Sequence, residues 1–279
     1  MTQSVRTSLR RMRRRLPRPL AFAYRAMVKD RGGFVDCAAF LRNGPSVWSR
    51  FTRVNFVRRV LRTSYNVDSA HSEGEILTFV RAVAALPATV PGVIVEAGCY
   101  QGSGTAKLSW LAALTGRRLI VFDSFRGMPP NTEDHGRNIY GTPTQFPERV
   151  YKGALDVVKR HVEVYGRIDV CQFVEGWFED TMPNFSEPVA AVYIDVDLAS
   201  STRTCLKHLY PLLSPGGVLV SQDAHLPLVI QVLEDDQFWQ DEVGAPRPQF
   251  VGLRRRKLVA ARKPPLPSAT TPGGGKLRS

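Results

Sequence analysis

Short apolar runs alternate with longer segments of helical spacing between residues 93 and 240 of the chain. The apolar runs predict buried strands at residues 93–95, 119–122, 170–174, 189–194 and 218–220. The segments between them predict helices at residues 103–115, 152–164, 200–213 and 226–240, with Ser103 as a candidate N-cap and Ser214-Pro215-Gly216-Gly217 as a stop. Strands that alternate with helices predict an α/β fold with a doubly wound, mostly parallel sheet.

The segments on either side of this alternation have different patterns. Residues 34–90 carry apolar positions at helical spacing and predict a helical cap or lid before the α/β domain of residues 91–263. Residues 250–253 and 257–261 are expected to form a final hairpin. Residues 1–33 predict a basic tail, and residues 264–279, rich in Pro, Ser, Thr and Gly, predict a disordered tail.

The composition is that of a globular protein. The 279 residues are 43% hydrophobic and 23% charged, which favours one domain with extensions. No apolar run approaches the roughly 20 residues that a membrane span needs, and none follows the basic N-terminus as in a signal peptide. The cysteines (Cys37, Cys99, Cys171 and Cys205) are scattered without a C-x-x-C pair. This argues against a zinc site or a disulfide framework and predicts a cytoplasmic protein.

The net charge of +13 comes from the two ends of the chain. Residues 1–30 hold nine Lys/Arg and one acid, and residues 254–279 hold eight Lys/Arg and no acid, so the body between them is weakly acidic. Such tails are either solvated segments or docking segments for an anionic surface such as lipid headgroups. The N-terminal basic run lacks interleaved aromatic residues, so no nucleic-acid partner is expected.

Acidic, glycine and small polar residues gather where four of the predicted strands end. These positions lie in residues 95–102, 122–125, 193–197 and 221–223. In open α/β sheets, ligands bind in the crevice outside the carboxyl ends of the strands. The pattern predicts one crevice that holds a nucleotide-like cofactor with a metal beside it.

The first two strand ends carry the features of a cofactor site. Gly98 and Gly102 allow a sharp turn and a close approach of the backbone to a ligand. Asp123 is placed to accept hydrogen bonds from both hydroxyls of a ribose, and Glu96 to meet the amino group of a zwitterionic cofactor; loop or capping carboxylates are the alternative. The glycine spacing also matches short-chain dehydrogenases, but no tyrosine has a lysine four residues later, as their catalytic pair requires.

The other strand ends carry aromatic and acidic groups. Trp177 and Phe178, after Gly176, offer a flat surface for adenine or pack ordinarily. Asp195 and Asp197 are two residues apart, so they point the same way from a strand end. Asp223 ends the next strand with Gln222 before it, and neighbouring strands lie about 4.8 Å apart. Asp195, Gln222 and Asp223 therefore predict a site for Mg²⁺ or Ca²⁺, with His225 nearby as a base, a ligand or a structural residue.

Five segments together resemble the macrocin O-methyltransferase family, which are S-adenosylmethionine-dependent enzymes of the class I Rossmann-like methyltransferases. They are Val-Glu-Ala-Gly-Cys-Tyr-Gln-Gly (95–102), Asp-Ser-Phe-Arg-Gly-Met-Pro (123–129), Gly-Trp-Phe-Glu-Asp-Thr-Met-Pro (176–183), Ile-Asp-Val-Asp-Leu (194–198) and Leu-Tyr-Pro-Leu-Leu-Ser-Pro-Gly-Gly (209–217). The similarity covers roughly residues 70–240. It implies S-adenosylmethionine as the cofactor, bound by Glu96, Gly98, Tyr100, Gly102, Ser103, Asp123, Ser124, Gly176, Trp177 and Phe178.

The resemblance also implies a magnesium site and a reaction. In the family, an aspartate on the fourth strand and an Asp-Asp pair after the fifth bind Mg²⁺, which holds two sugar hydroxyls. Asp195 and Asp223 match two of these ligands, but Gln222 replaces the first aspartate of the pair and removes one negative charge. Val196 also replaces the usual glycine, which leaves the backbone there less free. The expected activity is O-methyl transfer to a sugar hydroxyl, with Asp195 as general base and metal ligand.

The sequence leaves several points open. Residues 34–70 and 128–150 are expected to form the lid and the substrate wall. Because loops as long as the second segment are commonly either functional or disordered, disorder is the alternative for residues 128–150. A metal-dependent glycosyltransferase that uses Asp195-x-Asp197, or a non-catalytic cofactor-binding protein, is the alternative function. Neither the methyl acceptor nor a homo-oligomeric state can be read from the sequence.

Overall fold

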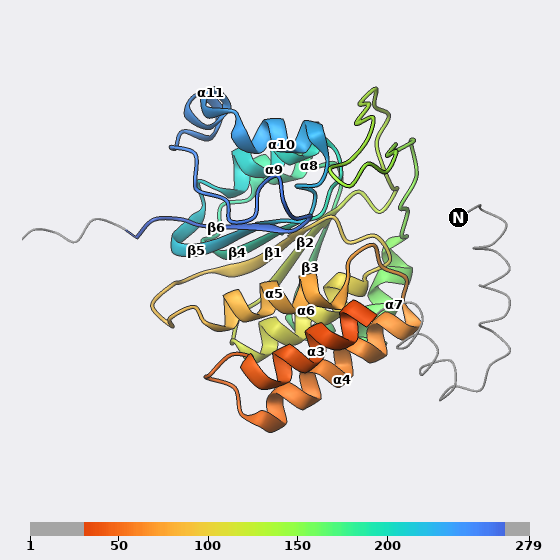
Figure 1. Ribbon diagram of the computed structural model, residues 1–279, viewed down its shortest axis with the longest axis vertical. Coiled ribbons are helices and arrows are strands. Elements are labelled where there is room, and N and C mark those ends of the chain that lie inside the picture. The colour runs from red at the N-terminus through yellow and green to blue at the C-terminus, as the bar shows by residue number, and fades with distance from the viewer. Residues whose placement is uncertain (1–30, 266–279) are drawn as a thin grey trace, which may run out of the picture.

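The computed structural model describes residues 31–265, which are built around a six-stranded sheet of order β3-β2-β1-β4-β5-β6 (Figure 1). The first five strands run parallel, and β6 runs antiparallel to β5 at the edge. This confirms the predicted doubly wound, mostly parallel sheet. The strands are β1 (Val93–Ala97), β2 (Leu119–Asp123), β3 (Cys171–Glu175), β4 (Val189–Ile194), β5 (Leu213–Ser221) and β6 (Val259–Arg262).

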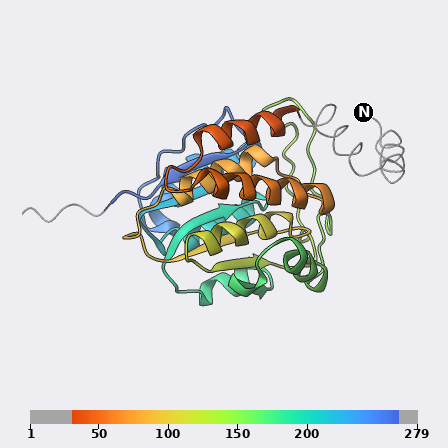
Figure 2. The same ribbon diagram turned by 90° about the horizontal axis from the view of Figure 1, so that it is seen from below.

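Helices cover both faces of the sheet. The face in Figure 2 is covered by α3 (Arg31–Asn43), α4 (Arg50–Asn66), α5 (Glu73–Ala84), α6 (Ser103–Leu114) and α7 (Leu155–Tyr165). The opposite face carries α8 (Phe178–Thr181), α9 (Ala199–Leu209), α10 (Pro227–Glu234) and α11 (Asp236–Phe238) (Figure 1). Short turns complete the chain: the 3₁₀ helices η2 (Ile168–Val170) and η3 (Met182–Asn184), and the π-helix η4 (Trp239–Val243).

Burial explains why the apolar runs form the central strands. Every residue of β1 and β4 is buried, as expected for parallel strands with helices on both faces. Because side chains alternate along a strand, Ile94 and Tyr193 enter the core on one face, while Val95 and Ile194 enter the core on the other. The sheet therefore separates two apolar cores and holds its strand ends in fixed register.

The helices α3 to α5 confirm the predicted helical character of residues 34–90. An aromatic cluster joins α3 to α4: the ring centroid of Phe56 lies 6.1 Å from that of Phe40 and 5.3 Å from that of Trp48. The helix α5 begins with a capping box, in which Ser72 and Glu75 bond to each other's backbone N–H groups. The predicted tails lie outside the described residues, apart from residues 31–33, which begin α3, and residues 264–265.

Three local predictions are wrong. Gly102, not Ser103, is the N-cap of α6. The helix α9 ends at Leu209, and the predicted stop at residues 214–217 lies inside β5, where the pairing with β4 shifts register. The predicted final hairpin is reduced to one bridge between Val251 and Ala260, and β6 pairs with β5 instead.

Within residues 31–265, no helix is both long and apolar enough to cross a membrane.

Candidate active site

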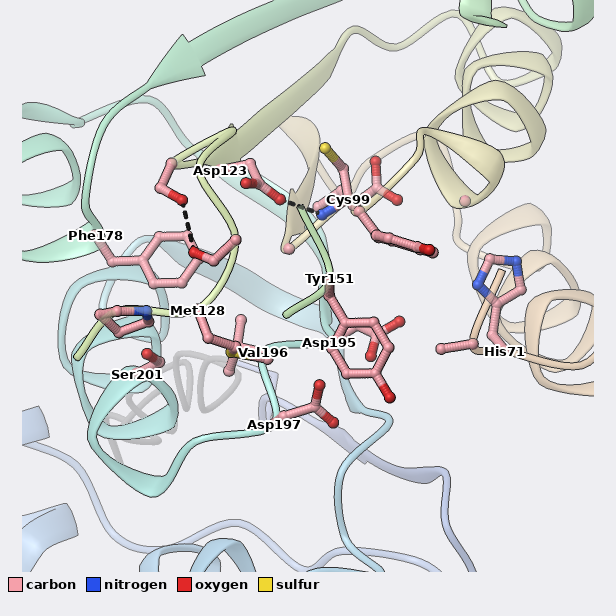
Figure 3. A pocket seen from close by; sticks show the side chains of 18 of the residues that line it. His71, Cys99, Asp123, Met128, Tyr151, Phe178, Asp195, Val196, Asp197 and Ser201 are labelled. Carbon is pink, nitrogen blue, oxygen red and sulfur yellow. Dashed lines mark hydrogen bonds between the residues drawn. The ribbon is translucent and has the colours of Figure 1, made fainter. Parts of the chain in front are cut away.

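An open cavity lies at the carboxyl ends of the parallel strands (Figure 3). It contains about 840 Å³ of space, its mouth to the solvent included. Residues that follow β1, β2, β3 and β4 line it, together with the loop at residues 68–71 and parts of the segment between β2 and α7. The ends of β1, β2 and β4 thus meet in one crevice, as the strand-end pattern predicted, whereas the fourth predicted segment, residues 221–223 at the end of β5, does not line it.

Most of the predicted site residues lie around this one cavity. Those that line it are Glu96, Gly98, Tyr100, Ser103, Asp123, Ser124, Gly176, Trp177, Phe178 and Asp195. Gly102 is at the N-cap of α6 and does not line it, and Gln222 and Asp223 lie behind its wall. His225 is also outside the lining; burial lowers its pKa to about 4, and its ring stacks on Tyr140.

A glycine lets the two halves of the cavity approach each other. Gly98, just after β1, has a φ of +82°, and a Cβ there would lie 2.0 Å from the backbone oxygen of Asp195. The N–H of Asp195 donates to the carbonyl of Ala97 at 2.9 Å. No side chain fits between these segments, so the end of β1 is held directly against the end of β4.

Asp123 holds the turn that follows β1. One of its carboxylate oxygens accepts a hydrogen bond from the N–H of Cys99 at 2.7 Å, and the other accepts one from the N–H of Phe125 at 2.7 Å. Burial raises the pKa of Asp123, while these backbone donors act in the opposite direction. An ionised carboxylate has about four acceptor positions, so Asp123 keeps capacity for ligand hydroxyls.

Glu96 is a buried acid beside the first turn of α6. Its side chain is 1% exposed, and burial raises its pKa to about 8. A Cβ on Gly104 would lie 2.5 Å from Oε1 of Glu96, so a glycine is needed where the carboxyl group meets the helix. Among the described residues, Oε2 has no hydrogen-bond partner. A buried acceptor without a partner is uncommon in folded proteins and marks a place for a ligand donor.

Apolar side chains line the opposite end of the cavity. Trp177 is the N-cap of α8 and Phe178 its first residue, and Met128 comes from the segment after β2. Figure 3 shows Phe178 and Met128 on the side of the cavity away from His71. The hydroxyl of Ser124 accepts from the N–H of Arg126 and donates to the carbonyl of Gly127, both at 3.1 Å, so it shapes this segment. The cavity therefore has a polar end at Glu96 and an apolar end at Trp177 and Phe178.

Three aspartates form an acidic cluster where β4 and β5 end. One carboxylate oxygen each of Asp195, Asp197 and Asp223 lies within 4.8 Å of the others. Around an octahedral Mg²⁺ with bonds of about 2.1 Å, neighbouring ligand oxygens lie about 3.0 Å apart and opposite ones about 4.2 Å, so small side-chain movements would bring the three oxygens onto one cation. Burial, and then the charge of Asp223, raise the pKa of Asp195 and of Asp197 well above their usual range.

The hydrogen bonds of Asp223 leave one oxygen available. Its Oδ2 accepts from the N–H groups of Val196 at 2.8 Å and Asp197 at 2.9 Å, whereas its buried Oδ1 has no partner in residues 31–265. Carboxylate oxygens are the ligands that Mg²⁺ prefers, so the cluster fits one hard divalent cation. The positive φ in this segment falls on Asp197, at +60°, and not on Val196, which explains how valine is accommodated there.

Gln222 is tied to the helical cap. Its Nε2 donates to Oε2 of Glu75 at 3.2 Å, and the same Glu75 oxygen accepts from the N–H of Ser72 at 2.7 Å. The amide oxygen of Gln222 is buried and has no partner in the described part of the chain. Its role as a metal ligand stays a prediction.

The sequence reasoning missed several lining residues. Asp197 was seen to point the same way as Asp195 but was not placed in the ligand set. Tyr151, with a φ of +57°, packs edge-on against Tyr100 at 5.4 Å between ring centroids and stands beside Asp195 in Figure 3. Burial and then Asp197 raise the pKa of Tyr151. Neither Tyr151 nor His71 lies in a recognisable motif, because only the folded loops bring them to the cavity.

The long segment after β2 is held by specific contacts. The carboxylate of Glu133 accepts from the N–H groups of Ala199 at 2.6 Å and Ser200 at 2.9 Å, at the start of α9. The N–H of Ile139 donates to the carbonyl of His225 at 2.9 Å. Of residues 128–150, Met128 and Pro129 line the cavity, and of residues 34–70, only Asp68, Ser69 and Ala70 do so. The predicted lid and wall thus reach the site through their ends.

The fold is that of the class I Rossmann-like methyltransferases. The O-methyltransferase NovP has a similar structure, with a TM-score of 0.58 at 22% identity over 69% of this chain and 81% of that chain. The calicheamicin methyltransferase CalS11 has a TM-score of 0.52 at 20% identity over 84% of this chain and 93% of that chain.

Residues 77–242 match the family described as macrocin-O-methyltransferase (TylF), and the chain belongs to this family. The chain is 34% identical over 143 residues to the 8-demethyl-8-(2,3-dimethoxy-alpha-L-rhamnosyl)-tetracenomycin-C 4'-O-methyltransferase of Streptomyces olivaceus, over 48% of this chain and 53% of that protein. It is also 34% identical over 145 residues to the mycinamicin III 3''-O-methyltransferase of Micromonospora griseorubida, over 50% of this chain and 57% of that protein. The chain thus spans about half the length of these curated relatives.

Proposed function

We propose that this chain is an S-adenosylmethionine-dependent O-methyltransferase that acts, with a divalent cation, on a hydroxyl of a sugar or glycosylated small molecule. The observation that carries the proposal is the single cavity, in which Glu96 and Asp123 lie on one side and Asp195 and Asp197 on the other. The contact of Gly98 with the Asp195 backbone fixes the distance between the two sides. Methyl transfer needs this fixed juxtaposition of donor and acceptor.

The cofactor side of the cavity matches the parts of S-adenosylmethionine. This molecule, when bound, supplies a methyl group that is already activated on a sulfonium. Asp123 would accept hydrogen bonds from the ribose hydroxyls, and Trp177 and Phe178 would offer a flat surface to the adenine. Glu96 would bind the ammonium of the methionine part, a donor for the carboxyl oxygen that has no partner within residues 31–265.

The acceptor side is assigned to the three aspartates. Asp195, Asp197 and Asp223 would hold Mg²⁺, with the amide oxygen of Gln222 as a further ligand. Bound there, the cation supplies positive charge that lowers the pKa of a hydroxyl beside it. Asp195 accepts the proton of the acceptor hydroxyl as general base. Tyr151 forms the wall over the acceptor.

A sugar hydroxyl is the acceptor class that the relatives support. One matched relative is named for methylation of a rhamnosyl derivative, and the other is a mycinamicin III 3''-O-methyltransferase. The aromatic rings of Tyr100 and Tyr151 line the cavity beside the acidic cluster and offer apolar surfaces to a sugar ring.

Ligand binding tests the class of enzyme. Calorimetry is expected to show binding of S-adenosylhomocysteine by the full chain and no binding of UDP in the presence of Mg²⁺. Binding of UDP without binding of S-adenosylhomocysteine would contradict the proposal and support the glycosyltransferase alternative.

Replacing Asp123 tests the cofactor side. Asp123→Asn is expected to weaken S-adenosylhomocysteine binding by about tenfold to hundredfold, because it removes the charge from an acceptor of ribose and backbone hydrogen bonds. The control is Asp169→Asn, which changes an exposed acid paired with Arg167 and should leave the dissociation constant unchanged. Equal affinities of the two variants for S-adenosylhomocysteine, measured by calorimetry, would contradict the assignment of Asp123 to the cofactor site.

Glu96 predicts a pH dependence of stability. Its pKa is about 8 in the folded protein and near 4.5 when exposed, so between these values the folded state binds a proton that the unfolded state lacks. The stability of the cofactor-free protein therefore falls as pH rises through this window, by at most about 1.4 kcal/mol per pH unit. Glu96→Gln removes this slope. Urea unfolding of the native protein and of Glu96→Gln between pH 5.5 and 8 measures this slope. The same dependence of the unfolding free energy on pH in both proteins would contradict a raised pKa of Glu96.

A further inference from the structure

A buried lysine lies behind the polar end of the cavity. Lys107, in the second turn of α6, is 1% exposed, and its Nζ lies 3.0 Å from Nε2 of His71. His71 belongs to the loop between α4 and α5 and lines the cavity. The pair therefore joins α6 to this loop beside Glu96.

The lysine determines which nitrogen of His71 carries the proton. An ammonium group has three donors and no acceptor, so Nε2 of His71 accepts from Lys107. Burial, and then the charges of Lys107 and Lys257, lower the pKa of His71 well below its usual range, so the ring is neutral. A neutral ring that accepts at Nε2 has its proton on Nδ1. Figure 3 shows His71 at the edge of the cavity with one ring nitrogen toward the interior, so this N–H is offered to a ligand.

Glu96 and His71 meet at the same point of the helix. A Cβ on Gly104 would lie 2.5 Å from Oε1 of Glu96 and 3.4 Å from Cε1 of His71. Glu96 suits a cationic group. His71, with a buried ammonium behind it and the N-terminus of the 12-residue helix α6 beside it, suits an anionic group. The hydroxyl oxygen of Ser103, buried and without a partner in the described residues, adds a further polar group there.

An ammonium and a carboxylate on one carbon match this pair of side chains. We propose that His71 binds the carboxylate of the methionine part of S-adenosylmethionine through Nδ1–H; this inference rests on the proposed function. Lys107 is the positioning residue that fixes the tautomer of His71. Together with Glu96, these residues select a cofactor that carries an intact amino acid.

Two ligands that differ only in the carboxylate test the role of His71. Calorimetry compares S-adenosylhomocysteine with its analogue that keeps the amine but lacks the carboxylate. The native protein is expected to prefer S-adenosylhomocysteine by about tenfold to hundredfold. His71→Leu reduces this preference to near one, and His71→Asn, which keeps an amide N–H near the position of Nδ1, retains part of it. His208→Leu, on α9, is the matched control and leaves the preference unchanged.

A spectroscopic readout tests the role of Lys107. In ¹⁵N spectra of the histidine side chains, the signal missing from His71→Leu identifies His71, and we expect it to show the Nδ1–H tautomer. Lys107→Met keeps the length of the side chain, and it is expected to change this signal toward the other tautomer and lower the carboxylate preference about tenfold. An unchanged tautomer in Lys107→Met contradicts the positioning role. If Lys107→Met does not fold, the two His71 variants decide the binding role.

The outcomes separate this inference from the proposed function. If the native protein binds S-adenosylhomocysteine and His71→Leu keeps the full preference for it, the inference is wrong and the proposed function stands. If the native protein binds neither ligand, the proposed function fails, and the inference fails with it.

Discussion

Replacing Asp195 by alanine is expected to lower the turnover number about 10³-fold or more, because the change removes the general base and a metal ligand together. Asp195 lines the cavity, and its backbone touches Gly98 on the cofactor side while its carboxylate faces Asp197 and Asp223. The contact of residue 195 with Gly98 is made by its backbone, which alanine keeps, so the affinity for S-adenosylhomocysteine should change less than about threefold. Methyl transfer from labelled S-adenosylmethionine, together with calorimetry, measures both quantities.

The fold should survive this change. Burial and the neighbouring carboxylates raise the pKa of Asp195, which means that its ionised form is unfavourable in the cation-free protein. Replacing it by alanine removes an ionisable group that is unfavourable at this position, so the thermal midpoint of Asp195→Ala is not expected to fall. Asp241→Asn, an exposed acid in η4, serves as the control with native turnover. Native-like turnover in Asp195→Ala would contradict the mechanism.

Removing divalent cations with EDTA is expected to lower turnover about 100-fold, and Mg²⁺ should restore it. Three carboxyl groups within 4.8 Å of one another are unfavourable to ionise without a cation, so a bound cation should also stabilise the fold. We therefore expect Mg²⁺ to raise the thermal midpoint of the native protein but not that of Asp223→Asn. This second readout does not depend on knowing the methyl acceptor.

Gln222 supplies a sharper version of the same test. Gln222→Asp adds the negative charge that the family pair carries, so the Mg²⁺ concentration needed for half-maximal turnover should fall about tenfold. Gln222→Glu is the matched variant, with the same charge on a longer side chain. If EDTA leaves the turnover number unchanged and Gln222→Asp has no effect on it, methyl transfer does not depend on a cation at the acidic cluster.

The strands and most of the cavity lining could be predicted from the sequence for a physical reason. Strands that are buried on both faces are continuous apolar runs. Polar residues at the carboxyl ends of such strands lie at the edge of the sheet where the ligand crevice forms. Glu96, Asp123 and Asp195 each follow such a run directly. Their position therefore follows from the alternation of apolar strands and helices along the sequence, and the resemblance to the family adds their expected roles.

The remaining features depend on contacts between distant segments. Lys107 looks like an exposed position in a helix, and its burial against His71 follows only from the packing of the loop between α4 and α5 on α6. Tyr151 reaches the cavity because the segment after β2 is tied to α9 through Glu133. The helix stop at residues 214–217 was misplaced because a Pro-Gly-Gly signal also suits an irregular strand, and pairing with β4 decides between them.

The most direct test of the proposed O-methyl transfer is an assay with labelled S-adenosylmethionine, Mg²⁺ and a set of rhamnosides and other deoxysugar glycosides. The native protein and Asp195→Ala are compared side by side. The account predicts an alkali-stable methyl ether on a sugar hydroxyl with the native protein and none with Asp195→Ala. Equal labelling by both proteins, or label on a group other than a hydroxyl, would contradict it.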